Sequence, residues 1–212
     1  MAVLETKEIF YSHAKGTKVL SGVNALFETG MMYAILGPSG SGKTTLLSLL
    51  GGLDSPTKGE ILLDGETIAG HRLPYYRRNH VSLIFQSYNL IDYMTPVENI
   101  KLTAKQDPLP VLERLGLTKE EAKRNVLKLS GGQQQRVAIA RTLASCASFI
   151  LADEPTGNLD EDTAAEITGI LKESAHVLDK CVIVVTHSNE LAKQADVILR
   201  LKRGSLQTVK SH

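Results

Sequence analysis

The stretch "GPSGSGKT", residues 37–44, decides the fold class of this 212-residue chain. It matches the pattern G-x-x-x-x-G-K-[ST] at Gly37, Gly42, Lys43 and Thr44. The apolar run "MYAIL" precedes it and the helical run "TTLLSLL" follows it. Because a phosphate-binding loop of this kind joins a strand to a helix, the sequence predicts such a loop here rather than a flexible Gly/Ser turn.

The residue types of this loop suit an anion. Glycines let backbone N–H groups turn toward phosphate oxygens because no Cβ obstructs them, and the following helix presents its positive end. We expect Lys43 to reach the β- and γ-phosphates and the Thr44 hydroxyl to bind Mg²⁺. The predicted nucleotide-binding residues of the loop are Gly37, Pro38, Ser39, Gly40, Ser41, Gly42, Lys43, Thr44 and Thr45.

Composition is that of an ordinary globular protein, with 42% hydrophobic and 22% charged residues and a formal net charge of +1. No run of five or more Lys or Arg is present, so we expect no nucleic-acid partner. No apolar run approaches the ~18 residues of a membrane span, so another chain would have to cross any membrane involved. The two cysteines, Cys146 and Cys181, are predicted to be buried, reduced thiols.

Short apolar runs alternate with helical patterns, which predicts an α/β fold. The runs "VSLIFQ", "SFILADE" and "CVIVVTH" are apolar throughout and then polar, as expected of buried parallel strands. Sites in open parallel sheets form at the carboxyl ends of the strands. We therefore expect Gln86, Asp153, Glu154 and His187 to share one sheet edge. The Asp-Gly of "ILLDGETI", residues 61–68, predicts a hairpin.

Residues 87–144 are predicted to be a helical insert, and residues 1–86 and 145–212 the core and its β subdomain, in a single domain over 1–212. Thr95 is placed to cap a helix that has Pro96 at its first position. Thr118 with Glu121 has the spacing of a capping box.

The acidic pair that ends "FILADEP", residues 149–155, follows a predicted buried strand. Asp153 is expected to hold the Mg²⁺ shell through water, and Glu154 to polarise an attacking water. An acidic turn ended by Pro155 is the alternative interpretation.

A second glycine-led helix is predicted from "LSGGQQQRVAIAR", residues 129–141. Ser130 and Gln133 have capping-box spacing, which accounts for those two residues. It does not account for Gly131 and Gly132, because glycines weaken a helix start without local gain. The positive N-terminus of this helix would suit a γ-phosphate.

The order of these motifs, with "GNLD" at 157–160 and "THS" at 186–188, resembles that of ATP-binding subunits of ABC transporters, from Tyr11 to about Leu206. The resemblance implies the ABC ATPase fold: a RecA-like P-loop NTPase core with a mainly parallel sheet, an N-terminal antiparallel β subdomain and a helical insert. It also implies a homodimer or paired ABC ATPase that binds two ATP molecules head to tail. In that arrangement the helix after Ser130 meets the nucleotide of the other copy.

The resemblance also implies roles for single residues. Catalysis would involve Lys43, Gln86, Glu154 and His187, with Gln86 also at the Mg²⁺ together with Thr44 and Asp153. Nucleotide contact across the dimer would come from Ser130, Gly131, Gly132 and Gln133, and the dimer seam would include Ser130, Gly132 and Asp160. Tyr11 would stack on adenine with Val19 nearby. The alternatives are purely structural roles: a surface amide at Gln86, a structural histidine at His187, a helix cap at Asp160, and packing roles for Tyr11 or Tyr33.

Within the superfamily, "PTGNLD" resembles the MacB/LolD/FtsE branch, which implies a separate integral membrane permease, an activity in export or lipoprotein release, and a place at the cytoplasmic face of the membrane. An importer ATPase and a soluble ABC ATPase are the alternatives. A GTPase would need Asn-Lys-x-Asp, which the sequence lacks. The insert is shorter than expected for that branch. Its apolar residues Tyr88, Leu90, Ile91, Tyr93 and Met94 would either contact the permease or pack within the insert.

Overall fold

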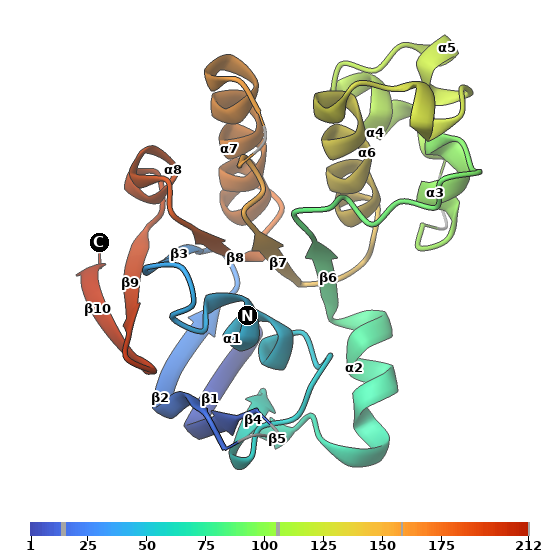
Figure 1. Ribbon diagram of the computed structural model, residues 1–212. Coiled ribbons are helices and arrows are strands. Elements are labelled where there is room, and N and C mark those ends of the chain that lie inside the picture. The colour runs from blue at the N-terminus through green and yellow to red at the C-terminus, as the bar shows by residue number, and fades with distance from the viewer. Residues whose placement is uncertain (14–15, 105–106, 158, 212) are drawn as a thin grey trace.

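The computed structural model describes residues 1–13, 16–104, 107–157 and 159–211. Two sheets, the helices that cover them and a group of insert helices make up the molecule (Figure 1). Asn158 of "GNLD" and residues 105–106 of the stretch expected to be helical lie outside the described residues. No helix in the described ranges has the length and apolar character needed to cross a membrane.

The first sheet is antiparallel and has the strand order β2-β1-β4-β5. Its strands are β1 (Val3–Ser12), β2 (Lys18–Glu28), β4 (Lys58–Leu63) and β5 (Glu66–Thr67). Asp64 and Gly65 join β4 to β5, and both have positive φ angles, 51° and 81°, as a tight hairpin turn requires. The hairpin predicted from "ILLDGETI" is therefore confirmed.

The second sheet has the order β10-β9-β3-β8-β7-β6 and is parallel except for the edge strand β10. Its strands are β3 (Met32–Leu36), β6 (Val81–Ile84), β7 (Phe149–Asp153), β8 (Cys181–Thr186), β9 (Val197–Lys202) and β10 (Ser205–Ser211). Every residue of β8 is buried, because both faces of the sheet are covered. This matches the parallel sheet predicted from apolar strands.

The helices that cover this sheet belong to two groups, one on the core and one in the insert. On the core they are α1 (Lys43–Leu50), α2 (Leu73–Asn79), α7 (Glu161–His176), α8 (Asn189–Lys193) and the short η1 (Gly70–Arg72). In the insert, which Figure 1 shows gathered beyond β6, they are α3 (Pro96–Lys101), α4 (Leu109–Arg114), α5 (Lys119–Ala122), η2 (Val126–Lys128) and α6 (Gly131–Leu143). Alternate residues of β8 point to opposite faces: Ile183 and Val185 pack with α1 and the antiparallel sheet, and Val182 and Val184 pack with α7 and the insert.

Local capping predictions agree with the structure. Thr95 caps α3, and capping boxes link Thr118 with Glu121 and Ser130 with Gln133. Asp160 caps α7, since its carboxylate accepts the Thr163 N–H at 2.9 Å.

One prediction about the cysteines is wrong. Cys181 is buried at the start of β8, but Cys146 is exposed. The apolar neighbours of Cys146 suggested burial, yet it lies in the loop between α6 and β7, where the chain passes over the surface.

Candidate active site

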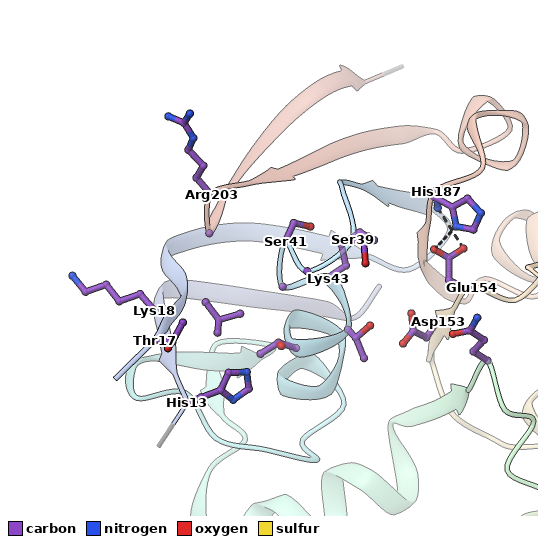
Figure 2. Close-up of a pocket in the computed structure, with 17 residues that line it drawn as sticks. His13, Thr17, Lys18, Ser39, Ser41, Lys43, Asp153, Glu154, His187 and Arg203 are labelled. Atoms are coloured by element: carbon purple, nitrogen blue, oxygen red, sulfur yellow. Dashed lines mark hydrogen bonds and ion pairs between the residues drawn. The ribbon is translucent and has the colours of Figure 1, made fainter. Parts of the chain in front are cut away.

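A cavity of about 870 Å³ lies at the carboxyl ends of β3, β7 and β8 (Figure 2). It brings together residues predicted from four separate motifs, as the shared sheet edge implied. The residues that line it are His13, Thr17, Lys18, Val19, Ser39, Gly40, Ser41, Gly42, Lys43, Thr44, Thr45, Gln86, Asp153, Glu154, His187, Arg203 and Gly204.

Two glycines of the phosphate loop are required by close packing. A Cβ on Gly37 would lie 2.5 Å from the Leu201 carbonyl oxygen. Gly42 has a φ of 98°, and its Cβ would lie 2.9 Å from a methyl of Val19. The loop is therefore pressed against β9 and β2, and its shape is set by tertiary contact as well as by glycine freedom.

Lys43 lies at the start of α1, directly behind the loop. Its ammonium donates hydrogen bonds to the carbonyl oxygens of Gly37 at 2.8 Å and Pro38 at 3.2 Å. Gly42 at the N-cap offers no side-chain cap to the first turn of α1. The N–H groups of that turn and the Lys43 ammonium are thus available to phosphate oxygens.

Thr44 and Asp153 fit a magnesium site. Burial raises the pKa of Asp153, while a hydrogen bond with Thr44 and the charge of Lys43 partly offset that effect. A hydroxyl and a carboxylate beside a phosphate site are ligands that Mg²⁺ takes in proteins. When bound, Mg²⁺ would neutralise charge that develops on the phosphate oxygens.

Glu154 and His187 lie side by side at the cavity, and dashed lines join them in Figure 2. Oε1 of Glu154 is 2.8 Å from Nδ1 of His187, and Oε2 accepts the Thr186 hydroxyl at 3.0 Å. The Glu154 backbone has a φ of 46°, and its N–H donates to the Val185 carbonyl at 2.9 Å. The contact with Glu154 uses Nδ1 of His187 and leaves Nε2 for another contact.

At the other end of the cavity the wall contains His13. Tyr11 is not in the lining, and its hydroxyl donates to Asp54 at 2.5 Å. The Tyr11 ring meets the His13 ring edge to face, with centroids 5.5 Å apart and planes at 87°. The stacking role of Tyr11 stays a prediction, and sequence reasoning missed His13. The sequence feature that points to His13 is its ring, two residues after Tyr11 in the same stretch of chain.

Sequence reasoning also missed Thr17, Lys18, Arg203 and Gly204. Gly204 accepts the Ser21 N–H at 2.9 Å, so the β9–β10 turn is attached to β2 beside the cavity. Figure 2 shows Lys18 and Arg203 pointing outward from the rim. The turn enters the site only through a contact between distant segments, which no local pattern reveals.

The residues predicted to act across a dimer lie outside this cavity. The N-terminal residues of α6, together with Asp160, are absent from its lining. Ser130 accepts the Gln133 N–H at 3.3 Å, and the Gln133 amide donates to Glu121 at 2.6 Å. Within one chain, these residues therefore take no part in the cavity, and their contact with a nucleotide stays a prediction.

Comparison with known proteins identifies the arrangement. Residues 20–157 match the family model described as "ABC transporter". The chain belongs to this family. It is 43% identical over all of its length to an uncharacterised ABC transporter ATP-binding protein, YclH of Bacillus subtilis, of which 98% is covered. That alignment spans 223 positions, more than the length of this chain, so the relative has residues that this chain lacks.

Two further relatives have more specific names. The lipoprotein-releasing system ATP-binding protein LolD of Psychrobacter arcticus is 40% identical, with 93% of each chain covered. The macrolide export ATP-binding/permease protein MacB of Brucella melitensis is also 40% identical over 93% of this chain, which matches 32% of that longer protein.

Solved structures give the same fold. The dimeric ABC transporter cassette MJ0796 is 34% identical, with a TM-score of 0.88 and coverage of 99% of this chain and 100% of the other. A second MJ0796 dimer, with the same TM-score and identity, is a post-hydrolysis state bound to ADP and Pi. The ABC ATPase fold and the membership in ABC transporter ATP-binding subunits are confirmed, and the protein is an ATPase that converts ATP and water to ADP and phosphate.

Proposed function

We propose that this ATPase is the motor of a MacB/LolD-type transporter, and that it works at the cytoplasmic face of a membrane with a separate integral membrane permease. The 40% identity to LolD and to the matching third of MacB supports an ATPase that drives a permease of this type. Two copies, or one copy and a related cassette, would close head to tail around two Mg-ATP.

The observation that carries this proposal is the separation of the two half-sites. Ser130 and Gly131 are exposed at the N-terminus of α6, yet they do not line the cavity that holds Glu154 and His187. A helix N-terminus attracts anions, and this one does not belong to the phosphate-binding cavity of its own chain. A γ-phosphate held by a second copy would satisfy it, with Asp160 at the seam.

Within each closed site the residues would divide the work. Lys43 would exchange the loop carbonyls for the β- and γ-phosphates, and Gln86 would orient water near the Mg²⁺. Glu154 would accept a proton from the attacking water. His187, held through Nδ1 by Glu154, would place Nε2 against the γ-phosphate.

The test is the mass of a variant that binds ATP but does not hydrolyse it. Glu154→Gln is expected to lose about 10²-fold or more in turnover, and to run as a dimer on gel filtration with light scattering when Mg-ATP is present. Glu60→Gln, at an exposed acid on β4 outside the cavity, is the matched control and should show the same turnover and the same oligomeric state with Mg-ATP as the wild type. A Glu154→Gln protein that binds ATP and stays a monomer at every concentration would contradict the proposal.

Permease contact is proposed for the segment 88–94. Tyr93 is 79% exposed at this surface, whereas Leu90 packs against the insert core. Co-expression and co-purification with a candidate permease tests the contact: Tyr93→Glu should lose the complex, and Tyr75→Glu, at an exposed ring on α2, should keep it.

A further inference from the structure

The backbone just after Gln86 takes an unfavourable conformation at two successive residues. Tyr88 has a φ of 59° and Asn89 a φ of 50°, both in the left-handed region. Residues with a Cβ stay in this region only where their surroundings hold them there, and such residues cluster at functional sites. The segment therefore needs an external support.

Arg141, at the far end of α6 from Ser130, supplies this support. Its guanidinium donates to the carbonyl oxygens of Asn89 at 2.7 Å and Tyr88 at 3.3 Å. Burial lowers the pKa of Arg141 from its ordinary value. None of the ion pairs within the described ranges includes Arg141. A partly buried cation thus depends on two carbonyls of the strained segment for its hydrogen bonds.

Two further contacts attach the same segment to the insert. A Cβ on Gly131 would lie 3.1 Å from the Tyr88 hydroxyl, so this ring ends beside the start of α6. The fully buried Asn99 accepts the Ile91 N–H at 2.7 Å and donates to the Ile91 carbonyl at 3.2 Å. The chain from residue 88 onward is thus fixed to the insert, and Gln86, two residues earlier, lines the cavity of the core.

We propose that Arg141 is a positioning residue for Gln86. Arg141 fixes the strained segment, Tyr88 and Asn89, to α6, so that Gln86 and Ser130 move together. The inference rests on the proposed function, because Ser130 matters to turnover only in a closed dimer. The helix has 13 residues, about 20 Å at 1.5 Å per residue. It joins Gln86 at one copy's nucleotide to Ser130 at the other copy's nucleotide.

This connection couples the two nucleotide sites. Filling one cavity shifts Gln86 and with it the helix that completes the partner's site, and by linkage the partner's nucleotide acts back in the same way. The steady-state rate of ATP hydrolysis should therefore depend cooperatively on ATP concentration in the wild type. This cooperativity should be lost when Arg141 no longer hydrogen-bonds to Tyr88 and Asn89.

The experiment compares Arg141→Met and Arg141→Lys with Arg136→Met. Arg136 lies on the same helix and also donates through its guanidinium, to Glu166 and the Leu115 carbonyl, but none of these hydrogen bonds reaches residues 86–91. Misplacement of a group near the chemistry lowers kcat by about 10- to 100-fold, and we expect this of Arg141→Met. The affinity of monomeric Arg141→Met for a fluorescent ATP analogue should equal that of the wild type. Arg141→Lys, which keeps the charge without the fork, should fall between.

A second substitution separates positioning from general stability. Glycine adopts the left-handed region freely, so Asn89→Gly should preserve the segment's shape without Arg141 and restore part of the lost kcat and cooperativity, about threefold in rate. Arg136→Met should lower the melting temperature, keep cooperativity and gain nothing from Asn89→Gly. Equal losses in Arg141→Met and Arg136→Met, without rescue, would overturn the inference.

Failure of this inference is distinguishable from failure of the proposed function. If Glu154→Gln does not dimerise with ATP, the dimer mechanism itself is wrong. If Glu154→Gln dimerises, and Arg141→Met retains wild-type kcat and cooperativity, only the role of Arg141 is wrong.

Discussion

The Glu154 carboxylate is shared between the ring of His187, whose Nδ1 lies 2.8 Å away, and the hydroxyl of Thr186, 3.0 Å away. Glu154 follows β7. Thr186 is the last residue of the neighbouring strand β8, and His187 follows it, so the parallel pairing of the two strands sets the geometry. The pair is unequally exposed: 14% of the Glu154 side chain is accessible against 73% for His187. The carboxylate is thus held in place, and the ring can respond to what enters the cavity.

Removal of the ring should lower the rate more than the affinity. His187→Ala is expected to lose about 10²-fold in kcat, because Glu154 keeps its charge but loses the partner that orients it and the γ-phosphate contact. Thr186→Val keeps the shape of the fully buried side chain and removes only its hydroxyl, so its loss in kcat should be smaller. Steady-state kinetics and nucleotide binding measure both variants. A rise in KM with unchanged kcat would place His187 outside the chemistry.

The base end of the cavity should depend on His13 as well as on Tyr11. Loss of a stacked ring costs about 1–3 kcal/mol, or about 5- to 150-fold in affinity, so His13→Ala should raise the KM for ATP. Tyr11→Phe removes only the hydrogen bond to Asp54 and should have a smaller effect, while Tyr11→Ala also removes the edge against which the His13 ring packs. Identical ATP affinity in His13→Ala and the wild type would show that the base lies elsewhere.

Ionised Asp153 should cost stability when no ligand is present. Burial raises its folded-state pKa above the unfolded value, so the folded protein binds more protons between the two pKa values and loses stability as pH rises through them. Asp153→Asn is therefore expected to raise the melting temperature at pH 7.5 without nucleotide. The gain should vanish at a pH below the unfolded pKa of about 4, where both forms are neutral. The same variant should lose Mg²⁺-dependent turnover. A lower melting temperature for Asp153→Asn at pH 7.5 would contradict this explanation.

Two glycine substitutions should have opposite effects on the free energy of unfolding. Gly169 lies exposed inside α7 with no atom near its absent Cβ, so Gly169→Ala should stabilise the protein by about 0.5–1 kcal/mol. Gly37→Ala places a methyl against the Leu201 carbonyl and should destabilise the protein and weaken ATP binding. Urea unfolding measures both. A destabilising Gly169→Ala would indicate a contact on α7 made by a partner molecule.

The sequence by itself determined several features that depend on neighbouring residues. The phosphate loop, the acids at the end of β7, the caps at Thr95, Thr118 and Ser130 and the Asp-Gly hairpin all rest on spacings of a few residues. Hydrogen-bond geometry and glycine freedom act over this range, so the pattern of residue types is sufficient. The parallel sheet also followed, because strands buried on both faces must be apolar throughout.

The shared sheet edge predicted that Gln86, Asp153, Glu154 and His187 meet, but only the tertiary structure decided the other contacts between distant segments. It placed His13 rather than Tyr11 in the cavity wall, attached the turn at Gly204 beside the phosphate loop, exposed Cys146, and set Arg141 against carbonyls some fifty residues earlier in the chain. These contacts depend on how strands are ordered in the sheet and how the insert folds back on it. Local residue types do not encode that order, because the same short patterns are compatible with many arrangements until the whole core packs.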